Sequence, residues 1–171
     1  FPYTTLFRSG FPVNYAQKGE IGFDCALPLP ASIESISAGV APNAVPGEAF
    51  MVWHGDAQAV AGLLASGTDE GGSFEVEPLS GGRARIKAIG RSGHGAVPQL
   101  ALSALHVLAS TLGSDAAAGV VDDETRAFLA GLDGWIVPPF GNGFGFAFED
   151  EDTGKTTSNL GIASTEDGEL R

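Results

Sequence analysis

Cysteine is almost absent from this sequence, since Cys25 is the single cysteine among 171 residues. An internal disulfide framework is therefore excluded, and we interpret Cys25 as a small strand residue. Basic residues are also scarce, because nine lysines and arginines stand against 21 acidic residues and give a net charge of −12 at pH 7. This charge argues against nucleic acid and anionic membranes as partners, because both repel an acidic surface.

Long apolar runs are missing as well. No run is long enough to span a bilayer, and no basic stretch followed by an apolar one forms a secretion signal. Together with the single thiol, these absences predict a cytoplasmic location. The chain is 43% hydrophobic, so it has enough apolar residues for a globular core, and its length suits one domain or part of a larger protein.

The two ends of the sequence indicate a piece of a longer protein. Phe1–Ser9 resembles the translation of a widely used sequencing-adapter oligonucleotide, so we expect it to contribute nothing to the fold and the natural sequence to begin near Gly10. The other end, "STEDGELR", stops in a predicted turn that enters a strand. We therefore expect residues 10–171 to be a single domain truncated at both ends.

Residues 20–29 alternate apolar with polar residues, which is the period of a β-strand, and further strand candidates are bounded by turn signals rich in glycine and proline. The predicted strands cover residues 20–29, 33–38, 48–53, 73–79, 83–90, 156–165 and 168–171. Three helices are expected: residues 57–66 after the N-cap Asp56, a helix from Pro98 to Leu112, and one that begins at 122–124 and ends near Gly131. This order predicts an α+β fold: a mostly antiparallel sheet with helices on one face, and a ferredoxin-like core with a split βαβ unit and insertions.

The sequence contains three histidines with different surroundings. His106 lies in an apolar helical run and His54 ends a strand, so we interpret them as a packing or surface residue and a turn residue. None of the three pairs with another histidine, with Cys25 or with a carboxylate at a metal-ligand spacing. We therefore predict no metal site within this chain.

His94 differs because Gly93 and Gly95 flank it and remove steric cover. A helix is expected to begin directly afterwards, and its N-terminus would add free N–H groups and the positive end of a dipole. An imidazole in that place can donate a hydrogen bond to an anionic or polarised oxygen. The residues alone leave the alternative of a plain turn histidine open.

Three short segments carry a resemblance to a known family. They are "GFPVNYAQKGEIGF" (residues 10–23), "AGVAPNAVP" (38–46) and "IGRSGHGAVPQ" (89–99). In the same order they resemble the domain junction, the loop G-x-A-x-N-x-V-P and the segment G-x-x-A/G-H-(G/A)-x-x-P of co-catalytic zinc metallopeptidase family number twenty. The junction is most similar to that of the larger bacterial dipeptidases of the Xaa-His, carnosinase-like type, and the resemblance runs from about Gly10 to Arg171.

This resemblance implies a two-domain enzyme in which the chain is the inserted lid or dimerisation domain. The separate catalytic domain of the family holds two divalent metal ions, usually zinc and sometimes manganese or cobalt. The resemblance implies that His94 donates a hydrogen bond to the oxygen of the tetrahedral intermediate and that Asn43 contacts the short peptide substrate. The junction aspartate that ligates metal in the family corresponds to Arg8 here, and no family role carries over to Arg171. The remaining ligands and the general-base glutamate would lie outside the chain, so we expect the isolated chain to hold no cofactor and to be inactive.

Other functions stay open from the sequence. A related enzyme of the same family, such as an acylamino-acid deacylase or a carboxypeptidase, would use the same lid, although the extra segment 115–155 favours the larger dipeptidases. A second alternative is a non-catalytic α+β module that forms a homodimer through a sheet edge or a helix face. A third is an unrelated domain that binds a small molecule.

Overall fold

The alternating segments build a four-stranded antiparallel sheet at the centre of the protein. The computed structural model describes residues 19–65 and 67–171. The strands lie in the order β2 (Ile33–Ala38), β4 (Glu48–His54), β6 (Arg83–Ile89) and β5 (Ser73–Leu79). Cross-strand partners point to the same side of a sheet, so Met51, Ile86 and Val76 form one apolar row across it.

The opposite face of this sheet is exposed and carries ion pairs. Arg85 lies 2.8 Å from Glu77, and the Lys87 ammonium lies 2.9 Å from Glu48. The same ammonium lies 5.7 Å from the centre of the Phe50 ring. The sheet is thus apolar on one side and charged on the other, as is common for antiparallel sheets.

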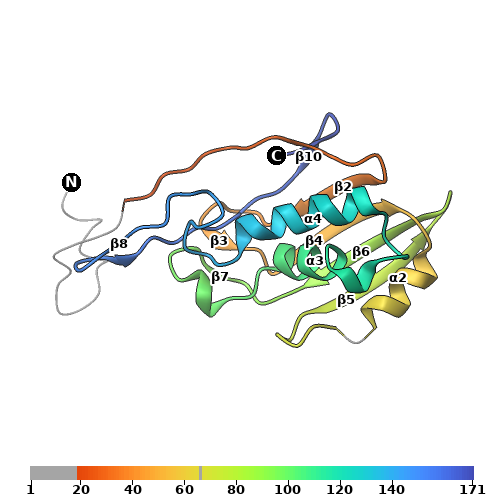
Figure 1. Ribbon diagram of the computed structural model, residues 1–171, viewed down its shortest axis with the longest axis horizontal. Helices are drawn as coiled ribbons and strands as arrows, with labels where there is room; N and C mark the ends of the chain where they lie inside the picture. Colours follow the sequence, from red (N-terminus) through yellow and green to blue (C-terminus); the bar gives the residue numbers. More distant parts are fainter. Residues whose placement is uncertain (1–18, 66) are drawn as a thin grey trace.

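Helices cover the apolar face of the sheet (Figure 1). The α-helices of the described chain are α2 (Ala57–Leu64), α3 (Ala104–Leu112) and α4 (Asp123–Ile136), and short 3₁₀ turns lie at η1 (Pro98–Leu100) and η2 (Asp115–Ala117). Helix α3 packs on β4 and β6, α2 packs on β5 and β6, and α4 packs on α3.

Polar caps and apolar burial explain where these helices form. The N-cap side chains of Asp56, Ser103 and Asp122 accept hydrogen bonds from backbone N–H groups in the first turns of α2, α3 and α4. In α3, Leu105 and Leu108 are completely buried. Burying each such side chain contributes about 1.5–3 kcal/mol to folding.

The connection from β4 through α2 to β5 is a split βαβ unit. Strand β6 lies between β4 and β5 and is antiparallel to both, so β4 and β5 run parallel to each other. The predicted α+β fold, with its mostly antiparallel sheet and its helices on one face, is therefore confirmed.

Short ladders extend the architecture beyond the main sheet. They are β1 (Leu27–Pro28) with β11 (Glu169–Leu170) and β10 (Thr165–Glu166), β3 (Ala44–Val45) with β7 (Gly93–His94), and β8 (Glu149–Asp150) with β9 (Gly154–Lys155). Ala163 bridges Ala38 of β2, and Thr165 Oγ1 accepts a hydrogen bond of 2.8 Å from the Ile36 N–H. The C-terminal segment thus covers the outer edge of β2, and Figure 1 shows it running beside the long N-terminal segment.

The N-terminal part of the described chain is mostly not a strand. The predicted strand 20–29 is wrong except for β1, because no strand of the described chain pairs with residues 20–26. Phe23 instead packs edge-on against Phe144 and Phe146, with ring centres 5.2 and 6.0 Å apart. The adapter-like segment 1–9, the junction motif up to residue 18 and Arg8 lie outside the described residues.

The predicted helix from Pro98 to Leu112 is also wrong in its first half. Pro98 begins only the 3₁₀ turn η1, after which Ala101 is extended with φ −112° and ψ 175°. The backbone of Leu102 pairs with Arg91 through two hydrogen bonds of 2.8 and 2.9 Å, and this pairing holds the chain out of a helix until Ser103 caps α3.

Helix α4 is longer than the sequence predicts. It passes Gly131 and ends at Ile136, because Leu132 and Ile136 continue its buried face. Pro138 disfavours helical geometry at Val137, which is extended and closes the helix. None of the helices in the described part of the chain is long and apolar enough to cross a membrane.

Candidate functional site

The ladder between β3 and β7 brings the two predicted site residues to neighbouring positions. Ala44 lies directly opposite His94, and Val45 lies opposite Gly93. The Gly95 N–H donates a hydrogen bond of 2.8 Å to the Asn43 carbonyl. Two loops that are some fifty residues apart in the sequence thus form one local surface that includes Asn43 and His94.

His94 is exposed, and its ring is oriented by its own loop. The Ala96 N–H donates a hydrogen bond of 3.0 Å to Nδ1 of His94. An imidazole nitrogen that accepts a hydrogen bond carries no proton, so the proton of the neutral ring lies on Nε2. The loop therefore leaves the Nε2–H of His94 as a hydrogen-bond donor.

The helix N-terminus predicted next to His94 is not present. The first α-helix after it begins at Ala104, and η1 separates the two. A single 3₁₀ turn lacks the aligned peptide dipoles of a full helix, so no helix dipole acts at His94. The imidazole itself is the polar group that this loop offers.

A third polar residue, Asn159, joins the loops of Asn43 and His94 and was missed by the sequence analysis. Its Nδ2 donates hydrogen bonds of 3.1 Å to the Pro42 carbonyl and 2.7 Å to the Ala44 carbonyl. These two carbonyls flank Asn43 on either side. The segment "TTSNLGIAST" that contains Asn159 indicated only a strand in the sequence. Nothing in a single sequence signals a contact with residues more than a hundred positions earlier.

Two glycines allow these segments to approach one another. A Cβ at Gly161 would lie 2.3 Å from the Pro42 carbonyl oxygen. A Cβ at Gly95 would lie 3.1 Å from the Asn43 carbonyl oxygen and 3.4 Å from Nδ2 of Asn159. The site is therefore packed backbone against backbone, with side chains absent where the loops meet.

The same three loop regions also expose apolar side chains. Val40, near Asn43, is 95% exposed, and Ile162, near Asn159, is 48% exposed. Leu100, which follows His94 in the chain, is 70% exposed. Polar groups at Asn43 and His94 thus have apolar residues nearby in the sequence. Such a combination suits a surface that contacts both the polar backbone and the apolar parts of a ligand.

The structure places His106 away from these loops, in a role that is structural. Its Nδ1 lies 2.6 Å from Asp133 Oδ1 on α4, and its Nε2 lies 3.2 Å from Glu70 Oε2. The hydrogen bond with the Asp133 carboxylate raises the pKa of the His106 imidazole against the opposing effect of burial, and Glu70 adds to the rise. Of the two alternatives expected for His106, packing or surface, its side chain matches packing, since it is only 14% exposed.

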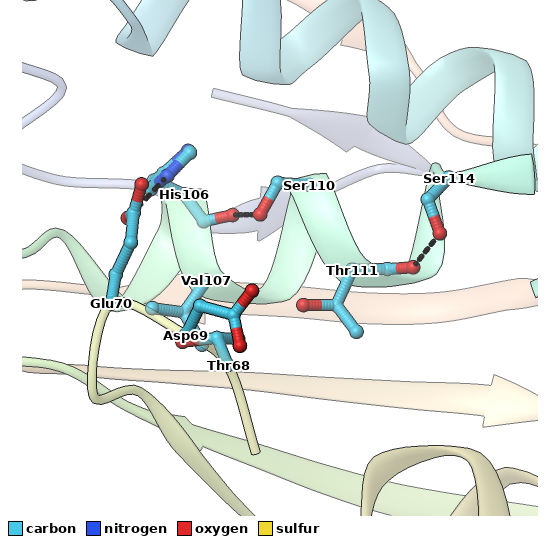
Figure 2. Close-up of a pocket in the computed structure, with 8 residues that line it drawn as sticks. All are labelled: Thr68, Asp69, Glu70, His106, Val107, Ser110, Thr111 and Ser114. Atoms are coloured by element: carbon cyan, nitrogen blue, oxygen red, sulfur yellow. Dashed lines mark hydrogen bonds and ion pairs between the residues drawn. The ribbon is translucent and has the colours of Figure 1, made fainter. Parts of the chain in front are cut away.

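His106 borders an open hollow of about 330 Å³ (Figure 2). Figure 2 shows Glu70 reaching toward the imidazole from one side of this hollow. The serine hydroxyls that line the hollow donate hydrogen bonds to backbone carbonyls: Ser110 to the His106 carbonyl and Ser114 to the Thr111 carbonyl. No hydroxyl here is paired with the imidazole, so the hollow has no activated nucleophile.

The remaining candidates of the sequence analysis lie apart from Asn43 and His94. His54 ends β4, where its Nε2 lies 3.7 Å from Glu34, and Cys25 is an exposed free thiol. Arg171 pairs with Glu169 at 3.2 Å. Among residues 19–65 and 67–171 no group of histidine, cysteine, aspartate and glutamate side chains is arranged to hold a metal ion.

Comparison of the sequence with protein-family models and with curated proteins found no significant match.

Proposed function

We propose that this chain is the lid domain of a metal-dependent dipeptidase, in which His94 stabilises the developing oxyanion and Asn43 contacts the peptide substrate. The observation that carries the proposal is the orientation of His94. Its Nδ1 accepts a hydrogen bond from the Ala96 N–H, so in the neutral ring the Nε2–H remains as a donor, beside the loop of Asn43. The order of the three family-like motifs supports the same reading.

The described residues do not fit the two metal ions of such an enzyme, because no suitable ligand group lies among them. The metal ions would belong to a catalytic domain outside this chain, and we assign no step on them to these residues. The contribution of the chain begins when the peptide carbonyl is attacked and negative charge grows on its oxygen. A donor that meets this oxygen when the lid closes stabilises the transition state more than the substrate.

The test is His94→Ala in the full-length parent enzyme with a dipeptide substrate. Loss of one oxyanion donor lowers kcat by about 10²–10³-fold, which corresponds to about 2.7–4 kcal/mol. We expect KM to change much less, because the donor acts on a charge that the substrate does not yet carry. His54→Ala is the matched control, since it removes an exposed histidine at the far end of β4 and should leave kcat unchanged.

An unchanged kcat in His94→Ala would contradict the proposed role. Asn43→Ala separates the second role from the first. We expect it to raise KM with a smaller effect on kcat, because a substrate contact acts before the reaction as well as during it. A KM equal to that of the wild type would remove Asn43 from the substrate site.

The same lid chemistry serves an acylamino-acid deacylase or a carboxypeptidase of this family. Kinetics of the parent enzyme with dipeptides, N-acyl amino acids and longer peptides distinguishes the three enzyme classes by their kcat/KM values.

We also assign the protein to the cytoplasm, where an exposed free thiol such as Cys25 stays reduced. Detection of the parent protein in a secreted fraction would contradict this assignment.

A non-catalytic dimerisation module, the second candidate, would have to pair through the edge of β5. Strand β5 lies at the edge of the four-stranded sheet, and no strand of the described chain pairs with its outer side. Glu75, Glu77 and Pro78 on this strand oppose edge-to-edge pairing, since charged side chains and proline protect sheet edges. Helix α3 is mostly buried within the domain, so it offers little surface for a dimer. A concentration-independent dimer in light scattering, disrupted by further charge on β5, would favour this candidate.

A further inference from the structure

We infer that Asn159 is a positioning residue that holds the Asn43 loop in register with His94, an inference that rests on the proposed function. Asn159 lies in the C-terminal segment that follows the β8–β9 hairpin. It donates to the Pro42 carbonyl at 3.1 Å and to the Ala44 carbonyl at 2.7 Å. One amide group therefore holds the peptide units on both sides of Asn43.

The chemistry of the carboxamide suits this place. An asparagine Nδ2 carries two N–H donors in one plane, and here both meet carbonyl acceptors of the same loop. A serine in this position has one donor, and an ionised aspartate has none. An aspartate would also place a negative charge against two carbonyl dipoles, so the isosteric change is the most disruptive.

Geometry links this amide to His94 as well as to Asn43. The Asn43 carbonyl accepts from the Gly95 N–H at 2.8 Å, and Ala44 lies opposite His94 in the β3–β7 ladder. A Cβ on Gly95 would come within 3.4 Å of Nδ2 of Asn159, so the amide lies close to the His94 loop. Without Asn159, the Asn43 loop is held to β7 by the two-residue ladder and the Gly95 hydrogen bond.

The first experiment measures position without any activity. Chain carrying Asn159→Asp, Asn159→Ser or no change is labelled with ¹⁵N and studied by NMR. The readouts are the cross-strand contact between Ala44 and His94 and the ring nitrogen shifts of His94, which report whether Nδ1 still accepts a hydrogen bond. We expect both to change in Asn159→Asp and to change less in Asn159→Ser, which keeps one donor.

Asn142→Asp is the matched control, because it makes the same chemical change at an exposed asparagine outside the loops of Asn43 and His94. It should leave the Ala44–His94 contact and the His94 ring shifts unchanged. Wild-type readouts in Asn159→Asp would overturn the inference. If the Asn159→Asp protein does not fold, the Asn159→Ser protein takes its place in the test. Wild-type readouts in a folded Asn159→Ser protein would then also overturn the inference.

The second experiment uses the full-length parent enzyme. A displacement of about 1 Å at a reacting group can cost about 100-fold in rate, so we expect Asn159→Asp to lower kcat/KM by about that factor. We expect kcat to fall and KM to rise together, because His94 and Asn43 are released together. The control Asn142→Asp should leave both constants unchanged.

The two experiments separate the inference from the proposed function. Displaced NMR signals with unchanged kinetics would keep Asn159 as the residue that positions the loops and reject the catalytic roles of His94 and Asn43. Unchanged NMR signals would reject the positioning role whatever the kinetics show.

Discussion

The close backbone approach between Gly161 and Pro42 gives a sharp prediction for Gly161→Ala. An alanine Cβ at this position would lie 2.3 Å from the Pro42 carbonyl oxygen and 2.6 Å from both the carbonyl carbon and Cα of Pro42. Ordinary van der Waals contact begins at 3.4 Å, so the Pro42 backbone must move by roughly 1 Å. Because these are backbone atoms, no rotamer change relieves the contact, and the loop that carries Asn43 has to shift.

The expected cost follows from this overlap. Forcing an extra carbon into a packed site usually costs about 1–3 kcal/mol. For a protein of this size, 1 kcal/mol lowers Tm by roughly 2–4 °C, so we expect Gly161→Ala to lower Tm by roughly 2–12 °C. Differential scanning calorimetry of the chain measures this shift directly, with the wild type in the same buffer.

Gly62→Ala is the internal control for this prediction. Gly62 lies inside α2, and a Cβ there would have no neighbour within 4 Å. Alanine is favoured over glycine in a helix by about 0.5–1 kcal/mol, so Gly62→Ala should raise Tm slightly. Equal Tm values for Gly161→Ala and the wild type, or an equal fall in both variants, would refute the close approach at Pro42.

Two further predictions concern the helices. Asp56→Ala removes the N-cap of α2 and should lower the free energy of unfolding by about 1 kcal/mol in urea titrations, whereas no change would deny the cap a role. Asp133 raises the pKa of His106, so protonated His106 stabilises the fold below about pH 6.5, and this contribution is lost as the pH rises through the folded-state pKa. The stability difference between wild type and His106→Gln should therefore be larger at about pH 5.5 than at about pH 9, and a difference independent of pH would contradict the ion pair.

The central sheet and α2 were predictable because their signals are local. In β6 apolar residues alternate with charged ones, and in β4 a short run of apolar residues extends from Ala49 to Trp53. The Gly-containing turn before Arg83 marks the hairpin of β5 and β6. The helix predicted from Pro98 failed because a tertiary contact overrode the local signal. The bridge between Arg91 and Leu102 holds the chain extended where the apolar period alone favours a helix.

The candidate site was only partly predictable, for a similar reason. His94 and Asn43 stand out in the sequence by the glycines and prolines around them, but their pairing through β3 and β7 depends on the folded backbone. Asn159 gives no local signal, because its role is defined by carbonyl groups and every residue carries one. The tautomer of His94 likewise depends on a hydrogen bond that the sequence does not display.

The contact of Asn159 with the Asn43 loop has a consequence for the order in which the chain folds. Asn159 and Ala44 are 115 residues apart, and closing an unstructured loop of that length costs roughly 4 kcal/mol in chain entropy. Two hydrogen bonds cannot offset this cost alone, since each contributes about 0.5–1.5 kcal/mol. The sheet and its helices must therefore form first and shorten the remaining loop. The contacts of Asn159 with the Asn43 loop thus form late in folding, so a chain that ends before Asn159 lacks these contacts although most of its core residues are present.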